Sequence, residues 1–477
     1  MNLGSSKKIS GLFGAATADI TPTESILLAG YMRDQPTSEV RNPIHAKAAY
    51  FRSEEGDEAV IVNADVVGFS RSLIQRIADA VTARHGIARE HLILSATHNH
   101  SGPVVTGVLP LFHPFTEETE AAMDRYTERL FEAIGDCIDE AKSKAEPCRL
   151  DFYTGVVGFA VNRRRASAHL RHLPTVVDQD VPVLVATNAD DTIRGILFGY
   201  ACHTTVMFDN CIDGDYSGYA QAALERECPG STAIFLAGCG SDSNPLPRRK
   251  VSLSQTYGNL LATAVRDAMA SEGTRLATSR IRGYFQEIDL PLEPPPSEEA
   301  LVADLDEKTL RARVIAEQFR PMPPEFSLQE TEDLILRSMD SVRRKIQYQL
   351  DRHRTGTLAT KVPFAIQILQ LGGALNLVAL AGEPVADYSL RLKEQHGFLT
   401  TWPLGYCHDL MAYIPSLRVL REGGYEGKTA MLEYGLPSAF CENVEALILS
   451  EVATQMGRLR AESHHREPVV SDLLVSV

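Results

Sequence analysis

Two histidines separated by one residue are the first candidates for chemistry in this sequence. His98 and His100 stand in the segment THNHSGP (97–103), directly after an apolar run at 91–96 that is typical of a buried strand. Side chains at positions i and i+2 of an extended backbone point to the same side, so both imidazoles can face one cation. The spacing alone predicts a chelating pair, and a purely structural histidine pair at a strand end is the alternative.

Further ligand candidates also follow apolar runs. His203 comes after the run at 195–200, and Glu383 comes after the run at 375–380. Two histidines and a carboxylate from three strand ends form the ligand set of many hydrolytic zinc sites, which keep one coordination position open for water. For Glu383 by itself, a carboxylate at a helix N-terminus is the alternative. The convergence of three strand ends favours the metal site.

A polar turn follows another apolar run, at 233–237. The segment GCGSDSNP (238–245) has two glycines, which allow close approach of the backbone to a ligand, and then Asp242, Ser243 and Asn244. It has neither the G-x-S-x-G pattern of a serine-hydrolase elbow nor the pattern of a phosphate-binding loop. We predict that this turn faces the same crevice as the histidines, and an ordinary capped turn is the alternative.

The elements that carry these residues alternate between apolar runs and helical patterns, which predicts an α/β fold. In open α/β sheets, ligands bind in the crevice at the carboxyl ends of the strands. Strand patterns occur at residues 59–64, 91–96, 183–187, 195–200, 233–237, 363–368 and 375–380, and helical patterns occur at 72–84, 117–144 and 218–227. A charged, helix-forming segment at 297–354 is predicted to be an insertion of two or three helices, either a lid or a solvated hairpin.

Composition and charge exclude several classes of function. The 477 residues include 47 Lys and Arg against 62 Asp and Glu, which gives a net charge of −15. Because an acidic surface repels phosphates, no nucleic-acid partner is expected. No apolar run has the length of a signal peptide core or a membrane span, so we expect a cytoplasmic protein without stable membrane insertion. Eight cysteines without a C-x-x-C pair argue against a disulfide framework and a thiolate zinc site.

Taken together, several motifs resemble the N-terminal catalytic domain of the neutral/alkaline (non-lysosomal) ceramidase family. They follow the family's order along the chain, and THNHSGP is the most specific of them. The matching segments are 19–22, 95–103, 202–207, 214–220, 240–245, 382–383, Tyr413 and 424–427. The resemblance implies an α/β fold of mixed β-sheets flanked by helices, with 1–477 as a single catalytic domain and 297–354 as a helical insertion within it. Ceramidases carry a C-terminal immunoglobulin-like domain, which we do not expect here.

The resemblance also implies a cofactor and its ligands. It assigns a zinc ion (Zn²⁺) to His98, His203, Glu383 and Tyr413. His100 then becomes a neighbour that orients the site or stabilises the transition state, in contrast to the chelating pair that the spacing alone predicts.

The resemblance and the expected mechanism assign roles in substrate binding and catalysis to four more residues. Tyr425, twelve positions after the ligand tyrosine, matches a family tyrosine that helps to bind the carbonyl oxygen. Arg163 matches a family arginine near the site and is expected to hold a carboxylate or hydroxyl group of the substrate. Asn244 stands where the family has a serine, so we expect a hydrogen-bond donor and no serine nucleophile. Asp242 is expected to orient His100 or a water molecule.

These assignments predict a zinc-dependent amidohydrolase that cleaves an N-acyl bond with metal-activated water. The expected substrate is a small N-acylated molecule other than ceramide, and His100 is the expected general acid for the departing amine. A zinc-dependent esterase or lactonase and a non-catalytic ligand-binding relative are the alternatives. The role of 297–354 and the oligomeric state, with a homo-oligomer as one option, stay open.

Overall fold

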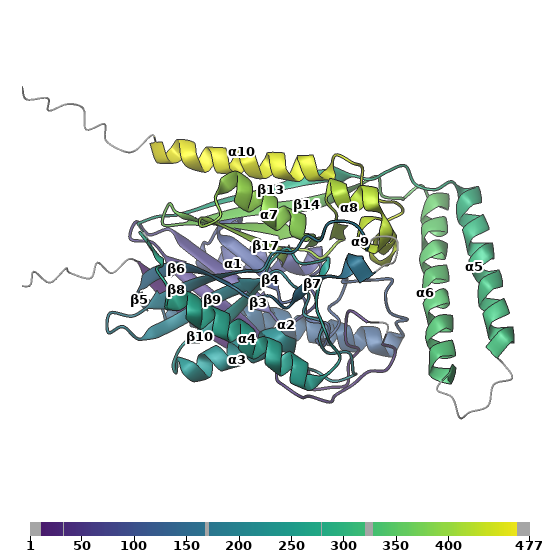
Figure 1. Ribbon diagram of the computed structural model, residues 1–477, viewed down its shortest axis with the longest axis horizontal. Helices are drawn as coiled ribbons and strands as arrows, with labels where there is room; N and C mark the ends of the chain where they lie inside the picture. Colours follow the sequence, from purple (N-terminus) through teal and green to yellow (C-terminus); the bar gives the residue numbers. More distant parts are fainter. Residues whose placement is uncertain (1–10, 32, 167–170, 278, 320–327, 465–477) are drawn as a thin grey trace, which may run out of the picture.

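Two β-sheets form the centre of the computed structural model, which describes residues 11–31, 33–166, 171–277, 279–319 and 328–464 (Figure 1). The larger sheet contains β1 (Leu12–Asp19), β2 (His45–Arg52), β3 (Glu58–Ala64), β4 (Leu92–Ala96), β5 (Glu146–Pro147), β13 (Ile281–Pro291), β14 (Lys361–Leu371), β15 (Leu375–Ala381) and β17 (Thr401–Cys407). Its strand order is β13-β14-β15-β17-β4-β3-β2-β1-β5. Pairs β3/β4 and β15/β17 are parallel, and the other neighbours are antiparallel.

The smaller sheet faces the larger one. It contains β6 (Arg149–Val156), β8 (Asp180–Thr187), β9 (Ile193–Tyr200), β10 (Thr232–Ala237) and β12 (Thr274–Leu276), in the order β10-β9-β8-β6-β12. Only β9 and β10 are parallel among these pairs. Two short pairs complete the strands of the described residues: β7 (Ala160–Asn162) with β11 (Ser243–Pro245), and β16 (Glu383–Pro384) with β18 (Tyr413–Ile414).

Helices cover the outer faces of both sheets. Helix α2 (Glu117–Ser143) packs on β1 and β2 beside α1 (Arg71–His85), and α3 (Asp215–Glu227) and α4 (Val251–Met269) pack on the smaller sheet. Helix α7 (Ala386–His396) contacts β17, and α10 (Val444–His464) lies along β13 and β14, at the top of Figure 1. The remaining helices are α5 (Glu298–Phe319), α6 (Leu328–Arg354), α8 (Leu417–Glu422), α9 (Gly424–Gly427) and the 3₁₀ turns η1 (Arg89–His91), η2 (Arg163–Ala166) and η3 (Thr429–Tyr434).

The core explains why the strands are almost continuously apolar. Along β3, Val60 and Val62 pack with the helices on one face, whereas Ile61 packs between the two sheets with Leu197 and Trp402. A strand that is buried on both faces needs apolar residues at every position rather than at alternate ones. The predicted α/β class, with mixed sheets flanked by helices, is confirmed.

The segment 297–354 contains the two helices α5 and α6, which lie side by side at one edge of the molecule (Figure 1). Leu301 of α5 and Ile346 and Leu350 of α6 form a small apolar cluster between the helices. Arg344 of α6 donates a hydrogen bond from Nη1 to the backbone carbonyl of His113 across 3.4 Å. Among the described residues, no helix combines the length and the apolar character that crossing a bilayer requires.

His113, beneath this hairpin, is expected to make stability depend on pH. Burial lowers the pKa of its imidazole to about 4, and the nearby cations Arg33 and Arg344 act in the same direction. The unfolded chain therefore binds this proton below a pH of about 6.5 while the folded chain does not, so stability falls by up to about 3 kcal/mol as the pH drops from roughly 6.5 to 4. Unfolding of His113→Gln at a series of pH values should lack this slope. The exposed His172→Gln is the control, and an unchanged slope in His113→Gln would contradict the assignment.

Candidate metal centre

Three histidine side chains meet at the carboxyl ends of strands from both sheets. His98 follows β4 of the larger sheet, and His203 follows β9 of the smaller sheet. Nε2 of His98 lies 3.1 Å from Nε2 of His100 and 3.2 Å from Nε2 of His203. The three imidazoles form a group that could hold a metal ion, and it includes the histidine pair that the spacing predicted.

The backbone decides which nitrogens of this group carry protons. Nδ1 of His98 lies 2.7 Å from the carbonyl of Val67, and Nδ1 of His203 lies 3.1 Å from the carbonyl of Gly240. Because a carbonyl oxygen only accepts, each Nδ1 is the protonated nitrogen and each Nε2 keeps a lone pair. Burial and the guanidinium of Arg163 lower the pKa of His203 to about 4, so its imidazole is neutral at pH 7. Two lone pairs therefore face each other, which favours a cation between them.

Glu383 adds a third acceptor to the same point. Its Oε2 lies 3.3 Å from Nε2 of His98 and 3.4 Å from Nε2 of His203, and it has no hydrogen-bond donor among the described residues. Its other oxygen, Oε1, accepts a hydrogen bond from the hydroxyl of Tyr434. Since a buried carboxylate oxygen without a partner is costly, the donor set of this centre fits a bound metal ion.

Strand pairing brings the predicted ligand tyrosine to the same place. The short strands β16 and β18 are parallel, and Glu383 is paired directly with Tyr413. The Tyr413 hydroxyl lies 3.5 Å from Nε2 of His203. Thus all four residues that the resemblance assigned as ligands lie together, and their individual roles stay predictions.

Arg163 contacts the tyrosine rather than the histidines. Its Nη2 donates to the Tyr413 hydroxyl across 2.9 Å, and its Nε donates to Glu426 across 2.7 Å. Burial raises the pKa of Tyr413 well above its usual range, and the positive charge of Arg163 acts against this shift. The arginine therefore favours the phenolate form, which is the better metal ligand.

His100 packs into a space that only glycine leaves open. Burial and the neighbouring His98 and His203 lower the pKa of His100 well below its usual range, so it is neutral at pH 7. Its Nδ1 has no hydrogen-bond partner among the described residues. Gly30, with a φ of 81°, lies against this ring, and a Cβ atom there would collide with Nδ1 and Cγ of His100.

Gly30→Ala is therefore expected to displace His100 and to lower turnover about 100-fold, the typical effect of losing one transition-state contact. Gly86→Ala is the matched control, because Gly86 has a similar φ of 71° and open space around it. Metal analysis of the Gly30 variant separates the two interpretations of His100: retained metal indicates a neighbour, and lost metal indicates a ligand. Full activity in Gly30→Ala would show that the position of His100 is unimportant.

Tyr425 and Asn244 are connected to the centre through neighbouring residues. The ring of Tyr425 packs edge-on against Tyr413 at a centroid distance of 5.3 Å, and its hydroxyl donates to Oε2 of Glu433 across 2.6 Å. Asn244 lies on β11, next to the turn that supports His203, and its buried Oδ1 has no partner within the described part of the chain. Ser243 contributes its backbone carbonyl, which accepts the N–H of His203 across 2.9 Å.

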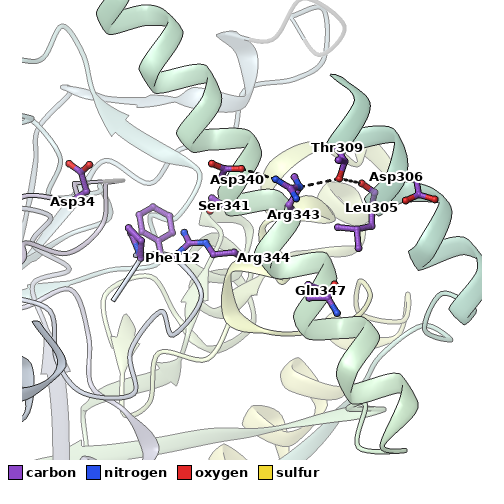
Figure 2. A pocket seen from close by; sticks show the side chains of 11 residues that line it. Asp34, Phe112, Leu305, Asp306, Thr309, Asp340, Ser341, Arg343, Arg344 and Gln347 are labelled. Carbon is purple, nitrogen blue, oxygen red and sulfur yellow. Dashed lines mark hydrogen bonds and ion pairs between the residues drawn. The ribbon is translucent and has the colours of Figure 1, made fainter. Parts of the chain in front are cut away.

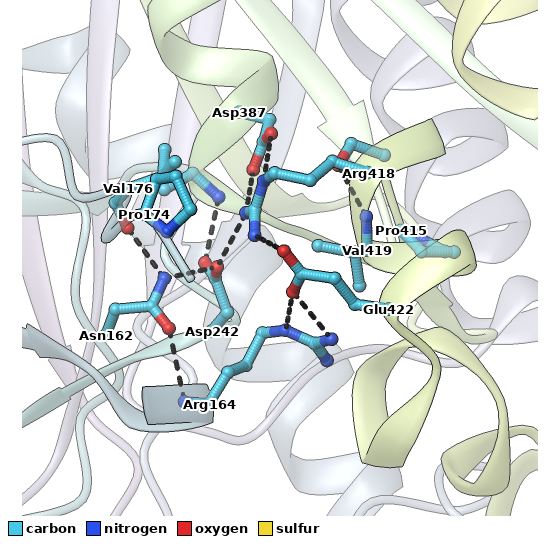
Figure 3. A network of polar contacts seen from close by, with 12 residues as sticks. Asn162, Arg164, Pro174, Val176, Asp242, Asp387, Pro415, Arg418, Val419 and Glu422 are labelled. Atoms are coloured by element: carbon cyan, nitrogen blue, oxygen red, sulfur yellow. Dashed lines mark hydrogen bonds and ion pairs between the residues drawn. The ribbon is translucent and has the colours of Figure 1, made fainter. Parts of the chain in front are cut away.

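Asp242 faces a different set of partners from the one that we expected. Figure 3 shows its carboxylate facing the side chain of Asn162, and its other oxygen accepts the backbone N–H of Ala386 at the start of α7. These hydrogen bonds measure 2.8 and 3.0 Å, and Arg418 adds an ion pair at 3.8 Å. Both oxygens are thus used to hold α7 and β7, and the structure does not bring this carboxylate to His100.

Two tyrosines at the centre had no distinctive spacing in the sequence. Tyr406 stacks on His98 with a centroid distance of 4.2 Å, and its hydroxyl lies 3.3 Å from Nδ1 of His203. Tyr434 orients Glu383, as described above. His98 and Tyr406 both have a positive φ, 56° and 53°, which is unusual for residues other than glycine and often marks functional sites. Backbone strain of this kind leaves no pattern in the residue order.

Comparison with known proteins places this geometry in a family. The family model described as neutral/alkaline non-lysosomal ceramidase, N-terminal, matches residues 12–244. A solved structure titled "Ceramidase complexed with C2" is similar with a TM-score of 0.69 and 16% identity, over 98% of this chain and 77% of that one. Neutral ceramidase from Pseudomonas aeruginosa is similar with a TM-score of 0.67 and 18% identity, over the same shares. Residues 12–244 therefore belong to the neutral/alkaline non-lysosomal ceramidase family, and the chain shares the fold of the solved ceramidases over nearly its whole length.

Proposed function

We propose that this protein is a zinc-dependent amidohydrolase that cleaves the N-acyl bond of a small-molecule substrate. The observation that carries the proposal is the set of three acceptors that face one another: Nε2 of His98, Nε2 of His203 and Oε2 of Glu383. A divalent cation is a partner for all three at once. Imidazole nitrogens together with carboxylate and phenol oxygens suit zinc well.

The spacing of the donor atoms is compatible with a tetrahedral zinc ion. Ligand atoms at about 2.0–2.1 Å from a tetrahedral zinc ion lie roughly 3.3 Å from one another. The corresponding distances are 3.2 Å between His98 and His203, 3.3 and 3.4 Å from Glu383 to these two, and 3.5 Å from Tyr413 to His203. We infer that His98, His203, Glu383 and Tyr413 are the ligands.

A zinc ion bound there would polarise the scissile carbonyl and supply a water nucleophile at neutral pH. His100 is neutral and lies beside the ligands, so its Nε2 takes a proton from the attacking water. The imidazolium that results gives this proton to the departing amine nitrogen. An amide needs that step, because an amide anion is a very poor leaving group.

Two further side chains act around the substrate carbonyl. Tyr425, beside Tyr413, donates a hydrogen bond to the carbonyl oxygen as negative charge develops there. Arg163 holds Tyr413 through Nη2 and is itself held by Glu426, so it orients the phenol and leaves little freedom for a second partner. Asn244, with its unpartnered Oδ1, is a polar group for the amide of the substrate.

Family membership supports an amide as the bond that is cleaved, because ceramidases are amidases. We propose a substrate other than ceramide, because helix α6 stands close to the groups that surround the centre. Arg344 of α6 contacts the carbonyl of His113, and Lys345 of α6 pairs with Glu433. A zinc-dependent esterase or lactonase would use the same residues and is the alternative.

Zinc analysis combined with matched substrates tests the proposal. The purified protein should contain stoichiometric zinc, and it should hydrolyse one or more N-acyl-4-nitroanilides in a series from acetyl to lauroyl. Activity should vanish with a chelator and return with zinc. The matched 4-nitrophenyl esters separate the two functions: cleavage of the esters with no cleavage of any anilide would establish the esterase. Unchanged anilide hydrolysis in a metal-free sample would overturn the zinc mechanism.

A further inference from the structure

Lys345 is a buried lysine of α6 that lies near the candidate metal centre but outside its ligand set. Its Nζ lies 3.6 Å from Oε1 of Glu433, on η3. Burial lowers the pKa of Lys345, and the negative charge of Glu433 acts in the opposite direction. Because a buried ammonium group is costly without an anion nearby, this ion pair ties α6 to η3.

The other oxygen of Glu433 holds the hydroxyl of Tyr425. That hydroxyl donates to Oε2 across 2.6 Å, and the Tyr425 ring packs against Tyr413. A continuous series of contacts therefore leads from the helical hairpin through Glu433 and Tyr425 to a predicted metal ligand.

The turn η3 supports the centre with two successive residues. Glu433 accepts the Tyr425 hydroxyl, and Tyr434 donates to Glu383. Gly435 follows with a φ of 77°, and a side chain there would press against the ring of Tyr348 on α6 at 3.2 Å. Helix α6 thus packs directly on the segment that orients both groups.

A second set of contacts fixes α6 next to Lys345. A pocket of about 580 Å³ lies between the hairpin and the loop at Phe112. Figure 2 shows the side chains of Phe112 and Arg344 next to each other at this pocket. Nζ of Lys345 lies 5.6 Å from the centre of the Phe112 ring, and Arg344 donates to the carbonyl of His113. The position of Lys345 is therefore set by the body of the protein as well as by Glu433.

We propose that Lys345 is a positioning residue for Tyr425, acting through Glu433, so that the hairpin of α5 and α6 is part of the active site. This inference rests on the proposed function, because it concerns the hydroxyl that binds the substrate carbonyl oxygen. In the structure that hydroxyl gives its hydrogen bond to Glu433. The positive charge of Lys345 weakens Glu433 as an acceptor, so the hydroxyl is able to turn toward an oxygen that gains negative charge during the reaction.

A double-mutant cycle on the full-length, zinc-loaded enzyme tests this role with the N-acyl-4-nitroanilides as probes. Lys345→Met should lower kcat about 10-fold, as outer residues that orient a catalytic group typically do, with KM within about twofold. Tyr425→Phe should lower kcat about 100-fold. If Lys345 acts through Tyr425, the double variant equals Tyr425→Phe alone, and Lys345→Arg restores kcat. Multiplied effects in the double variant, no rescue by arginine, or full activity of either single variant would overturn the proposal.

Hydrogen exchange gives a readout that does not depend on catalysis. Lys345→Met should speed amide exchange in residues 424–434, whereas Lys345→Arg should leave it unchanged, with zinc content equal in both variants. If the wild-type enzyme cleaves none of the anilides, the proposed function fails, and exchange alone then decides whether Lys345 holds this segment. Unchanged exchange at 424–434 in Lys345→Met would overturn the positioning role.

Discussion

Replacing His203 with alanine is expected to remove both the bound metal and the hydrolytic activity. His203 contributes one of three acceptors that face a common point, and its Nδ1–H is already committed to the carbonyl of Gly240. The loss in turnover should exceed the roughly 100- to 1,000-fold that follows removal of a single oxyanion donor, because the metal polarises the carbonyl and supplies the water. His98→Ala should behave in the same way.

A buried histidine outside the centre provides the matched control. His408 is as buried as His98 and has the same φ of 56°, but its Nδ1 contacts Arg89. His408→Ala should therefore retain stoichiometric zinc in metal analysis. Stoichiometric zinc in His98→Ala or His203→Ala would remove that residue from the ligand set.

Thermal unfolding should report the same substitutions independently of activity. Metal that binds only the folded chain raises the melting temperature of the wild-type protein, and this increase should be lost in His203→Ala. The metal-free forms of the variant and of the wild type are the references for this increase, because alanine also removes the buried hydrogen bond to the carbonyl of Gly240.

The second large effect is expected for Glu383→Gln. The amide keeps the size of the side chain and a carbonyl oxygen for the Tyr434 hydroxyl, but it removes the negative charge that faces the two imidazoles. We expect the affinity for zinc to fall by at least about 100-fold, since a neutral amide is a poor zinc ligand. Competition with a chromogenic chelator measures this change.

Tyr434→Phe serves as the graded comparison for Glu383→Gln. It leaves the carboxylate in place and removes only the hydroxyl that orients it, so the affinity should fall by about 10- to 100-fold, as is typical for partners of metal ligands. If Glu383→Gln bound zinc as tightly as the wild-type protein, the carboxylate would not be a ligand. If the two variants had equal effects, the charge of Glu383 would be unimportant.

Much of the fold was predictable because local patterns reflect burial. The apolar runs at 59–64 and 91–96 became β3 and β4, and the helical patterns at 72–84 and 117–144 became α1 and α2. A strand buried on both faces has to be apolar throughout, so it is visible in the residue order. The polar segment after β4 was visible for the same reason, since carboxyl ends of strands are where an α/β fold places its ligands.

Other features of the site depend on contacts between distant segments. The pairing of β16 with β18 brings Glu383 beside Tyr413, Tyr434 reaches Glu383 from 51 positions away, and Lys345 reaches Glu433 from another helix. The expected role of Asp242 did not follow from its place after a strand, because its carboxylate turns toward α7. Such contacts are set by how whole elements pack, and single residues carry no local signal for them.

By itself, the sequence determined the α/β class, the order of the main strands and helices, and the histidines and glutamate that follow strand ends. It could do so because each of these features depends on periodicity or on a short motif. Only the tertiary structure decided that the unprotonated nitrogens of two imidazoles and a carboxylate oxygen face one point, with their other atoms held by the carbonyls of Val67 and Gly240 and by Tyr434. The lone pair of an imidazole or a carboxylate faces the metal only if a hydrogen-bond partner holds the other nitrogen or oxygen of the same side chain. The folded chain brings that partner from a distant segment.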